Sequence, residues 1–332
     1  MIQRRRNGAG GDGACVLKAG VLKAGVVGAG AFGRHHAAKY AAMSEVELTV
    51  ADLNPEVRRQ FQVGQGVRSV ADWRDLLGKV DCVSVCSPAV THAEIVRAFL
   101  DAGAHVLVEK PIATDLDEAD ELIALAEANG RVLTVGHQER FVFARTGLLE
   151  FPDAPREIAC WRLGPWTGRG ADVSVVLDLM IHDLDLVHRL VPNDVGDVTA
   201  RARTVHGRHA DEVSATLAFE NGTLARLHTS RVAGARSRGM RVVYDDGAIE
   251  IDFITRKVKN TTARTLNGLA FEDPLGESVN SFVRSVRHGA ATLVRPEEAR
   301  RALETALLID DAADHTADVR AHEAYALHAA AR

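Results

Sequence analysis

The sequence predicts an α/β fold, with a doubly wound parallel sheet in the N-terminal part and a C-terminal α+β domain that contains a mostly antiparallel sheet. Three observations carry this prediction. A glycine-rich turn joins an apolar strand to an alanine-rich helix near residue 30, strands and helices then alternate to about residue 140, and beyond that point apolar residues recur with a period of two. The 332 residues suffice for about two domains. We expect them at residues 22–142 and 143–332.

The first strand, turn and helix have the pattern of a dinucleotide-binding unit. From Leu22 the chain reads LKAGVVGAGAFGRHHAAKY, in which Gly28, Gly30 and Gly33 form a GxGxxG motif. Such glycines allow a tight turn, a close approach of the backbone to a pyrophosphate and close packing of the helix on the strand. A second strand, VELTVA, ends at Asp52, 22 residues after Gly30, where an acidic residue binds the adenosine ribose and repels a 2′-phosphate. We therefore expect a Rossmann domain that binds NAD rather than NADP, with contacts from Gly28, Gly30, Ala31, Phe32, Gly33 and Asp52.

The alternation of strands and helices continues through the N-terminal domain. Repeated units of this length are typical of a parallel sheet with helices on both faces. We expect helices from Pro55 to about Gln62, Thr91 to Ala102 and Leu116 to Ala128, and strands at Asp81–Cys86, His105–Val108 and Val132–Gly136.

The pattern changes beyond Arg140. The segment DEVSATLAFENGTLARLHTS alternates with a period of two, and the dipeptides Asn221-Gly222 and Asp246-Gly247 are typical of tight hairpin turns. These features predict the antiparallel sheet of the second domain. Two helices, at about 276–288 and 296–314, are expected to follow it.

Composition and charge narrow the class of protein. The formal net charge is −5 and the basic residues cluster only at Arg4 to Arg6, which argues against a nucleic-acid partner. No stretch approaches the ~18 apolar residues of a membrane span, and residues 1–21 lack the apolar segment of a signal peptide, so we expect a disordered extension there. The four cysteines have no CxxC spacing. We expect reduced thiols, no metal and a cytoplasmic enzyme without a membrane partner.

Chemically reactive side chains follow three of the expected strands, in the loops SPAVTH, EKP and GHQERF. Ligands bind at this end of a parallel sheet. Lys110 of EKP is notable because the sequence has only seven lysines, and Lys110 is the single lysine in the long stretch between Lys79 and Lys257. A lysine ammonium is a compact charge with a tunable pKa, which favours a catalytic role over a chance surface position. We expect these loops to give the cofactor site Ser87, Pro88, His92, Glu109, Lys110 and Gln138.

An apolar run farther along, VVLDLMIHDLD, contains several titratable side chains. An uncompensated charge in such surroundings costs several kcal/mol. If the run is helical, Asp178, His182 and Asp185 share one face. A carboxylate one turn from an imidazole can orient the ring and set its proton affinity. The segment indicates a catalytic pair of Asp178 and His182, with a core histidine and a helical metal site as the alternatives.

Together, GAGAFG, EKP and DLMIHDLD resemble the motifs of the Gfo/Idh/MocA family of NAD(P)-dependent sugar oxidoreductases, over about residues 22–313. The resemblance implies that Lys110, Asp178 and His182 form a catalytic trio. His182 would take the proton of a sugar hydroxyl as hydride leaves the same carbon, and Lys110 would stabilise the developing alkoxide. Asp178 would hold His182 or the hydroxyl in line, while Asp183 and Asp185 would be structural.

Within the family, VGHQERF, RLGPWTGRGADVSVVLDLMIHD and AFENGTLARLHTSR resemble the branch that oxidises the C3 hydroxyl of UDP-N-acetylglucosamine. This implies a 3-keto product for a pyridoxal-phosphate aminotransferase, which would form a 2,3-diamino sugar for lipid A. It also implies a homodimer or homotetramer that assembles through the open face of the second sheet. A diphosphate needs cationic donors, and the candidates are Arg140, Arg162 and Arg169.

Two other functions remain open. Another enzyme of the same fold, such as an inositol or free-sugar dehydrogenase or a reductase, would use the same trio but would not need arginines that bind phosphate. A non-catalytic NAD-binding regulator would need neither the catalytic trio nor the phosphate-binding arginines. The presence of Lys110, Asp178 and His182 together argues against the regulator, because a sensor has no use for a tuned base beside an ammonium group.

Overall fold

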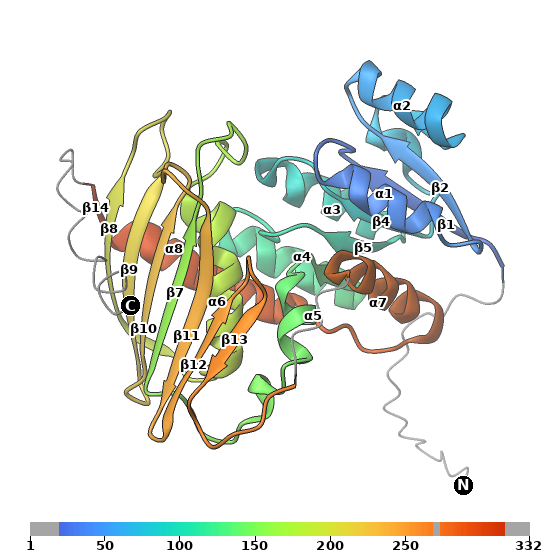
Figure 1. The fold of residues 1–332 in the computed structure, drawn as a ribbon. Coiled ribbons are helices and arrows are strands. Elements are labelled where there is room, and N and C mark those ends of the chain that lie inside the picture. The colour runs from blue at the N-terminus through green and yellow to red at the C-terminus, as the bar shows by residue number, and fades with distance from the viewer. Residues whose placement is uncertain (1–19, 268–272, 316–332) are drawn as a thin grey trace, which may run out of the picture.

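The structure, a computed structural model, describes residues 20–267 and 273–315 and contains two sheets with helices packed around and between them (Figure 1). One sheet is parallel and the other mostly antiparallel, which confirms the predicted fold class. The expected extension at residues 1–21 lies outside the described residues, except for Gly20 and Val21. The last part of the expected second domain, after His315, lies outside them as well.

The N-terminal sheet has six parallel strands in the order β3-β2-β1-β4-β5-β6. The strand order changes direction between β1 and β4, so the loops that follow these two strands lie next to each other. The strands are β1 (Leu22–Val27), β2 (Val46–Ala51), β3 (Arg68–Val70), β4 (Cys82–Val85), β5 (His105–Val108) and β6 (Leu133–Val135). The helices are α1 (Gly33–Ala41), α2 (Pro55–Gln65), α3 (His92–Asp101) and α4 (Leu116–Ala128), with short turns η1 (Trp73–Leu76) and η2 (Ala89–Thr91).

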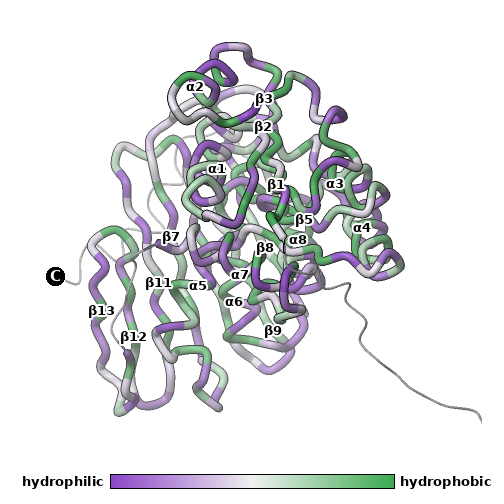
Figure 2. Tube along the Cα trace, turned by 90° about the vertical axis from the view of Figure 1, so that its right-hand side faces the viewer, coloured by the Kyte–Doolittle hydropathy of each residue, from purple (hydrophilic) through white to green (hydrophobic). Residues whose placement is uncertain are grey.

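Burial and local capping explain these elements. Strands β4 and β5 are buried along their whole length, as expected where helices cover both faces of a parallel sheet. Figure 2 shows the hydrophobic segments along β1 and β5, in contrast to the hydrophilic strand β13. Asn54 caps the N-terminus of α2 and Asp115 that of α4, since their side chains accept backbone N–H groups of the first turn. Helix α1 has no such side-chain cap.

The second sheet has eight strands in the order β13-β12-β11-β7-β10-β9-β8-β14. All neighbours are antiparallel except β7 with β10 and β8 with β14. The predicted hairpin at Asn221-Gly222 is confirmed, since this turn joins β9 to β10. The second predicted hairpin joins β11 to β12, but its turn residues are Asp245 and Asp246, because Gly247 already pairs with Tyr244 as the first residue of β12. The strands are β7 (Glu157–Leu163), β8 (Val195–Arg203), β9 (Glu212–Phe219), β10 (Leu224–Ser230), β11 (Ser237–Tyr244), β12 (Gly247–Asp252), β13 (Lys257–Asn260) and β14 (Ala313–His315).

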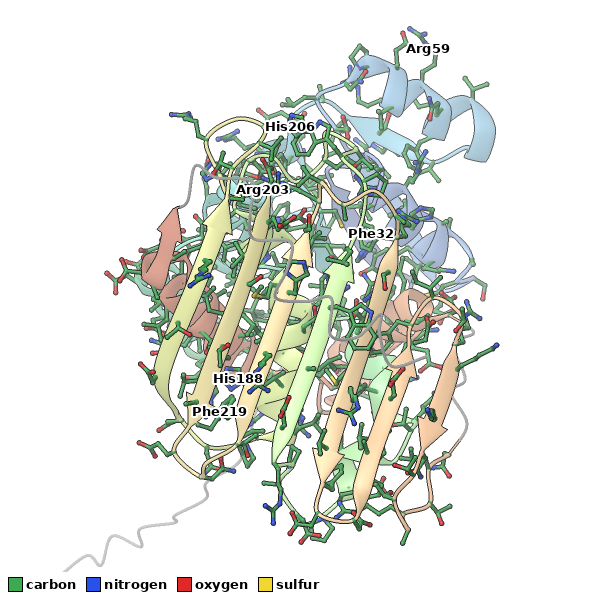
Figure 3. The ribbon with its side chains drawn as sticks, turned by 60° about the vertical axis from the view of Figure 1, so that its left-hand side comes forward. Phe32, Arg59, His188, Arg203, His206 and Phe219 are labelled. Carbon is green, nitrogen blue, oxygen red and sulfur yellow. The ribbon has the colours of Figure 1, made fainter. Side chains whose placement is uncertain are left out.

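The segment with Asp178 and His182 is helical but not a regular α-helix. A π-helical turn, η4 (Val176–Met180), leads directly into α6 (Ile181–Leu190). The run is therefore helical, but the π turn departs from the α-helical spacing from which we expected Asp178, His182 and Asp185 to share one face. Helix α6 packs on the inner face of the second sheet, where the rings of His188 and Phe219 meet edge to face at 5.9 Å (Figure 3).

The two C-terminal helices return to the N-terminal domain. Helix α7 (Pro274–His288) places Val279 and Phe282 in the same buried cluster as Leu22 and Tyr40, against α1 and the parallel sheet. Helix α8 (Pro296–Ala312) packs against α4 and β6 as well as α6 and β8. Both helices belong to the expected second domain, residues 143–332, so the two expected domains share part of their packing. Between the domains lie α5 (Glu139–Ala144) and η3 (Leu148–Glu150). No helix in the described part of the chain is long and apolar enough to cross a membrane.

Candidate active site

The glycine turn after β1 has the shape of a phosphate cradle. A Cβ on Gly33 would come within 1.9 Å of the carbonyl oxygen of Gly28, so close packing of α1 on this turn requires glycine. A Cβ on Gly30 would meet no atom within 4 Å, which leaves its backbone open to a ligand. No side chain caps α1, although the N–H groups of Arg34 and His35 in its first turn already donate to the carbonyls of Gly30 and Phe32. The positive end of the helix dipole still favours an anion at this turn. These residues, with Ala31 and Phe32 between them, fit the pyrophosphate of NAD.

Asp52 lies directly beside this turn. Its Oδ2 accepts the N–H of Ala29 and its Oδ1 accepts the N–H of Asn54, both at 2.8 Å. Each carboxylate oxygen keeps a lone pair for a further hydrogen bond. Arg58 donates to the backbone carbonyl of Asp52 at 2.7 Å and leaves the carboxylate free. Asp52 therefore fits the ribose hydroxyls, and its role there stays a prediction.

In the loop after β4, the three residues predicted to contact the cofactor have different surroundings. Ser87 accepts a hydrogen bond from the Thr91 hydroxyl at 2.7 Å, and Pro88 precedes η2. His92 is buried, and its two ring nitrogens lie 2.7 Å from the carbonyl of Pro111 and 3.0 Å from the carbonyl of Ser87. The expectation that His92 contacts the cofactor is not supported, because both nitrogens join the loops after β4 and β5.

The loops after β5 and β6 meet through Glu109. Its Oε1 accepts the Nε2–H group of Gln138 at 3.2 Å and lies 3.0 Å from Nε2 of His36. His36 in turn contacts Ser84 on β4 at 3.2 Å. Glu109 and Gln138 thus form a buried network beneath the predicted cofactor site, in which their side chains hold the loops that carry the catalytic residues.

The structure brings Lys110 and Asp178 together, although 68 residues separate them. The Lys110 ammonium lies 3.2 Å from Asp178 Oδ1 and also contacts the Asp178 carbonyl. Gly170 covers the carboxylate, since a Cβ there would lie 2.1 Å from Asp178 Oδ2. Among the described residues Asp178 makes no hydrogen bond to His182. The predicted role of Asp178 in orienting this histidine is therefore not supported, and Asp178 instead positions the lysine.

The surroundings of His182 disfavour its charged form. Burial lowers its pKa well below the usual value, and the nearby charges of Lys110 and Arg162 lower it further, as does His137. The rings of His137 and His182 meet edge to face at 6.1 Å. Within the described residues His182 Nδ1 is buried without a hydrogen-bond partner, whereas Nε2 is not enclosed in this way and the side chain is 16% exposed. At neutral pH His182 therefore has a free lone pair and can act as a base.

Two of the three arginines predicted to bind a diphosphate are occupied inside the protein. Arg140 is 2% exposed and donates to both oxygens of Asp185 at 2.7 Å and to Glu298 at 2.5 Å. Arg162 is likewise buried, between Asp183 and another carboxylate. This corrects the prediction for Arg140 and Arg162, because their donors are paired with carboxylates.

Arg169, the third of these arginines, is exposed rather than buried. It lies in the loop before η4, and in residues 20–267 and 273–315 no partner of its guanidinium is found. It therefore remains available to a negatively charged ligand. Asp183 and Asp185, expected to be structural, are the buried partners of Arg162 and Arg140.

Sequence reasoning missed Glu139 as a site residue. Its Oε1 lies 3.8 Å from His182 Nδ1, and its carboxylate pairs with Arg162 and Arg238. The signal available in the sequence was its place in the loop GHQERF, directly after a buried strand. Arg238 gave no such signal, because it lies on β11, far along the chain.

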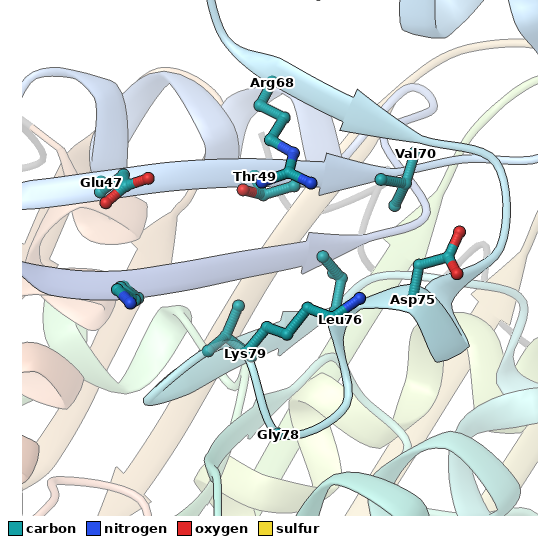
Figure 4. Close-up of a pocket in the computed structure, with 10 residues that line it drawn as sticks. Glu47, Thr49, Arg68, Val70, Asp75, Leu76, Gly78 and Lys79 are labelled. Carbon is teal, nitrogen blue, oxygen red and sulfur yellow. The ribbon is translucent and has the colours of Figure 1, made fainter.

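A cavity of about 320 Å³ lies elsewhere, on the face of the parallel sheet near its β3 edge (Figure 4). Its lining includes Lys23, Glu47, Arg68 and Lys79 but none of the predicted site residues. Within the described ranges, no group of three or more His, Cys, Asp or Glu side chains could hold a metal ion.

Two family models match the chain. The model of the oxidoreductase family with an NAD-binding Rossmann fold, GFO_IDH_MocA, covers residues 22–137, and that of the GFO/IDH/MocA C-terminal domain covers residues 150–250.

Among characterised relatives, the UDP-N-acetylglucosamine 3-dehydrogenase of Acidithiobacillus ferrooxidans is 33% identical over 289 residues, which cover 83% of this chain and 92% of the relative. The solved structure of that enzyme superimposes with a TM-score of 0.81, over 88% of this chain and 97% of the other.

More distant relatives have different substrates in their names. Inositol 2-dehydrogenase 3 of Saccharopolyspora erythraea is 24% identical, over 74% of this chain and 78% of the relative. The WlbA dehydrogenase of Bordetella pertussis, solved with NADH and UDP-GlcNAcA, is 18% identical and has a TM-score of 0.74, over 88% of this chain and 96% of the other, which shows the shared fold. This chain therefore belongs to the Gfo/Idh/MocA family of oxidoreductases and is an NAD-dependent dehydrogenase.

Proposed function

We propose that this enzyme oxidises the C3 hydroxyl of UDP-N-acetylglucosamine to the 3-keto nucleotide sugar. The observation that carries the proposal is the contact between Lys110 and Asp178 next to an uncharged His182, at the end of the sheet that binds NAD. The choice of substrate is supported by the 33% identity to a UDP-N-acetylglucosamine 3-dehydrogenase over most of both chains.

The residues of the site have distinct tasks in this reaction. NAD⁺, when bound, accepts the hydride from the reacting carbon. His182 accepts the hydroxyl proton at Nε2, the accessible nitrogen of its ring, in a role that typically contributes ~10²- to 10⁴-fold in rate. The Lys110 ammonium stabilises the negative charge that develops on the oxygen, and Asp178 holds this ammonium in place.

Arg169 is the residue that we assign to the diphosphate of the substrate. It lies in the loop that covers Asp178 through Gly170, so a sugar at the catalytic residues would place its diphosphate near this loop. Trp166 of the same loop stacks on His206 at 4.3 Å and lies 5.4 Å from Arg231. These contacts hold the loop at the site while Arg169 stays exposed.

We also propose an enzyme that uses the keto product and an oligomeric state for this protein. A 3-keto sugar is a substrate for a pyridoxal-phosphate aminotransferase, which would form the 2,3-diamino sugar. A homodimer or homotetramer would cover the face of the second sheet opposite α6 and α8, on which no helix of the described residues lies (Figure 1). Light scattering after size exclusion would give the mass of the assembly.

The test is reduction of NAD⁺ by the purified enzyme with UDP-N-acetylglucosamine, UDP-glucose and myo-inositol, with the product identified by mass spectrometry. We expect turnover with UDP-N-acetylglucosamine and a product two mass units lighter. Preferred turnover of myo-inositol would instead support the second candidate, an inositol dehydrogenase, which the inositol-specific relatives favour. No turnover with any sugar or polyol, despite NAD binding, would indicate a regulator.

A further inference from the structure

The carboxylate that lies against the ring of His182 belongs to Glu139. Its Oε1 is 3.8 Å from His182 Nδ1, and that nitrogen is buried with no hydrogen-bond partner in the described part of the chain. Asp178, which was expected beside the ring, contacts Lys110 instead. The base of the site therefore faces a carboxylate on one side and has an accessible Nε2 on the other.

Two arginines of the second sheet hold Glu139 in this position. Arg162 on β7 donates to its two oxygens at 3.0 and 2.7 Å, and Arg238 on β11 contacts Oε1. The same guanidinium of Arg162 donates to Asp183, the residue after His182, at 3.1 and 2.6 Å. One buried side chain thus fixes both the carboxylate and the helix that carries the imidazole.

The arginines do not use the whole carboxylate. A carboxylate accepts about four hydrogen bonds, two on each oxygen. Arg162 donates one hydrogen bond to each oxygen of Glu139, and Arg238 forms an ion pair with Oε1. Oε2 therefore keeps an open acceptor position for a donor from the side of His182. On that ring the candidate donor is Nδ1–H, because Nδ1 is the nitrogen that lies near the carboxylate and is buried without a partner in the described part of the chain.

Building on the function proposed above, we propose that Glu139 is a positioning residue for the base: it accepts the Nδ1–H of His182 and so keeps the Nε2 lone pair directed at the substrate hydroxyl. A neutral imidazole carries one proton, and fixing it on Nδ1 makes Nε2 the acceptor. The separation of 3.8 Å is long for a hydrogen bond, but such contacts tighten when substrate binds.

The charges around the ring act in opposite directions. Burial lowers the pKa of His182 most, and Lys110, Arg162 and His137 lower it further. The negative charge of Glu139 favours the imidazolium form, so it limits this decrease. The titratable groups that act on the ring are Lys110, His137, Glu139 and Arg162. Asp178 and Arg238 lie one contact farther away, against Lys110 and Glu139.

The first experiment determines the tautomer of His182 in the full-length enzyme by NMR of protein labelled with ¹⁵N in histidine. The His182→Asn variant identifies the signal. We expect a proton on Nδ1 and an unprotonated Nε2 at pH 7.5. A proton on Nε2 would overturn the proposal, and this measurement requires neither substrate nor a Glu139 variant that folds.

The second experiment compares Glu139→Gln with a matched control, Asp183→Asn. Each variant removes one negative charge that pairs with Arg162, but only the first changes the group that faces His182. In Glu139→Gln we expect the His182 titration and the acidic limb of kcat/KM to move to lower pH. We also expect kcat to fall roughly tenfold to a hundredfold, with KM nearly unchanged.

In Asp183→Asn we expect the His182 titration to stay where it is, even if the melting temperature falls. Equal pH profiles in the two variants would mean that Glu139 only pairs with Arg162, and the proposal would be wrong. Glu139→Asp, which keeps the charge, should restore most of the titration. Because the titration is read without substrate, its result is independent of whether UDP-N-acetylglucosamine is the substrate.

Discussion

At the scale of single residues, the surroundings of His182 determine which protonation state is available to the reaction. The ring is neutral because it is buried near the cations Lys110 and Arg162, and it is at the same time accessible at Nε2. A base must be unprotonated to accept the hydroxyl proton. The pH dependence of the reaction therefore reports directly on this residue.

We expect kcat/KM for sugar oxidation to rise with pH through one ionisation that lies below the ordinary histidine value of ~6.5, because the pKa of His182 is lowered. His182→Asn should remove this limb and lower kcat by roughly two orders of magnitude or more, with NAD binding unchanged. Chelators should have no effect on either protein. A limb that persists in the variant, or activity that zinc restores after chelation, would place the proton acceptor elsewhere.

The second prediction at this scale concerns Lys110. Its ammonium reaches both the carboxylate and the carbonyl of Asp178, a geometry that suits a compact point charge better than a planar guanidinium. Lys110→Arg should keep the fold and the NAD affinity but lose most of kcat. Steady-state kinetics measure kcat, and NAD titration measures the affinity for the cofactor. Near-normal turnover of the variant would show that Lys110 contributes to binding but not to catalysis.

At the scale of elements, the glycine turn gives a matched pair of variants. Gly33→Ala would place a Cβ 1.9 Å from the backbone of Gly28, so α1 must shift and we expect both stability and NAD affinity to fall. Gly30→Ala meets no protein atom within 4 Å and should fold like the wild type, while it weakens NAD binding alone. Thermal melts with and without NAD distinguish the two, and equal stability would contradict the packing argument.

The ion pairs between α5, α6 and α8 lead to a prediction about stability. Arg140 on α5 pairs with Asp185 on α6 and Glu298 on α8, and the first two side chains are almost completely buried. Arg140→Met leaves Asp185 buried without its partner, which should cost about 3–5 kcal/mol in the free energy of unfolding. Denaturant titration measures the loss. If the variant is stable and its KM for the nucleotide sugar is raised, Arg140 binds the diphosphate of the substrate as the sequence first predicted.

At the scale of the whole molecule, helices from the end of the chain join the two sheets. Helix α7 contributes to the core of the parallel sheet, and α8 packs against elements of both domains. We therefore expect calorimetry to show one cooperative unfolding transition. NAD at 100 times its Kd should stabilise the whole chain by about 2.7 kcal/mol. Two transitions, of which NAD shifts only one, would show that the domains unfold independently.

Much of the fold followed from local patterns. The glycine turn, the acid at Asp52 and the hairpins marked by Asn221-Gly222 and Asp246-Gly247 depend on a few neighbouring residues, and the sequence contains all of them. The strands β3 and β14 escaped prediction because each has only three residues, too few to establish a period. Strand β6 is equally short but was predicted, because it is buried along its whole length within an apolar run.

By itself, the sequence determined the fold class, the NAD-binding unit and the identity of the candidate residues Lys110, Asp178 and His182, because periodicity, turn chemistry and motif spacing are local properties. Only the tertiary structure decided which side chains meet. Lys110 and Asp178 are 68 residues apart and Arg140 and Asp185 are 45 apart, so no local pattern could pair them. Long-range packing sets burial, and burial determines whether an arginine binds a ligand or a carboxylate inside the protein.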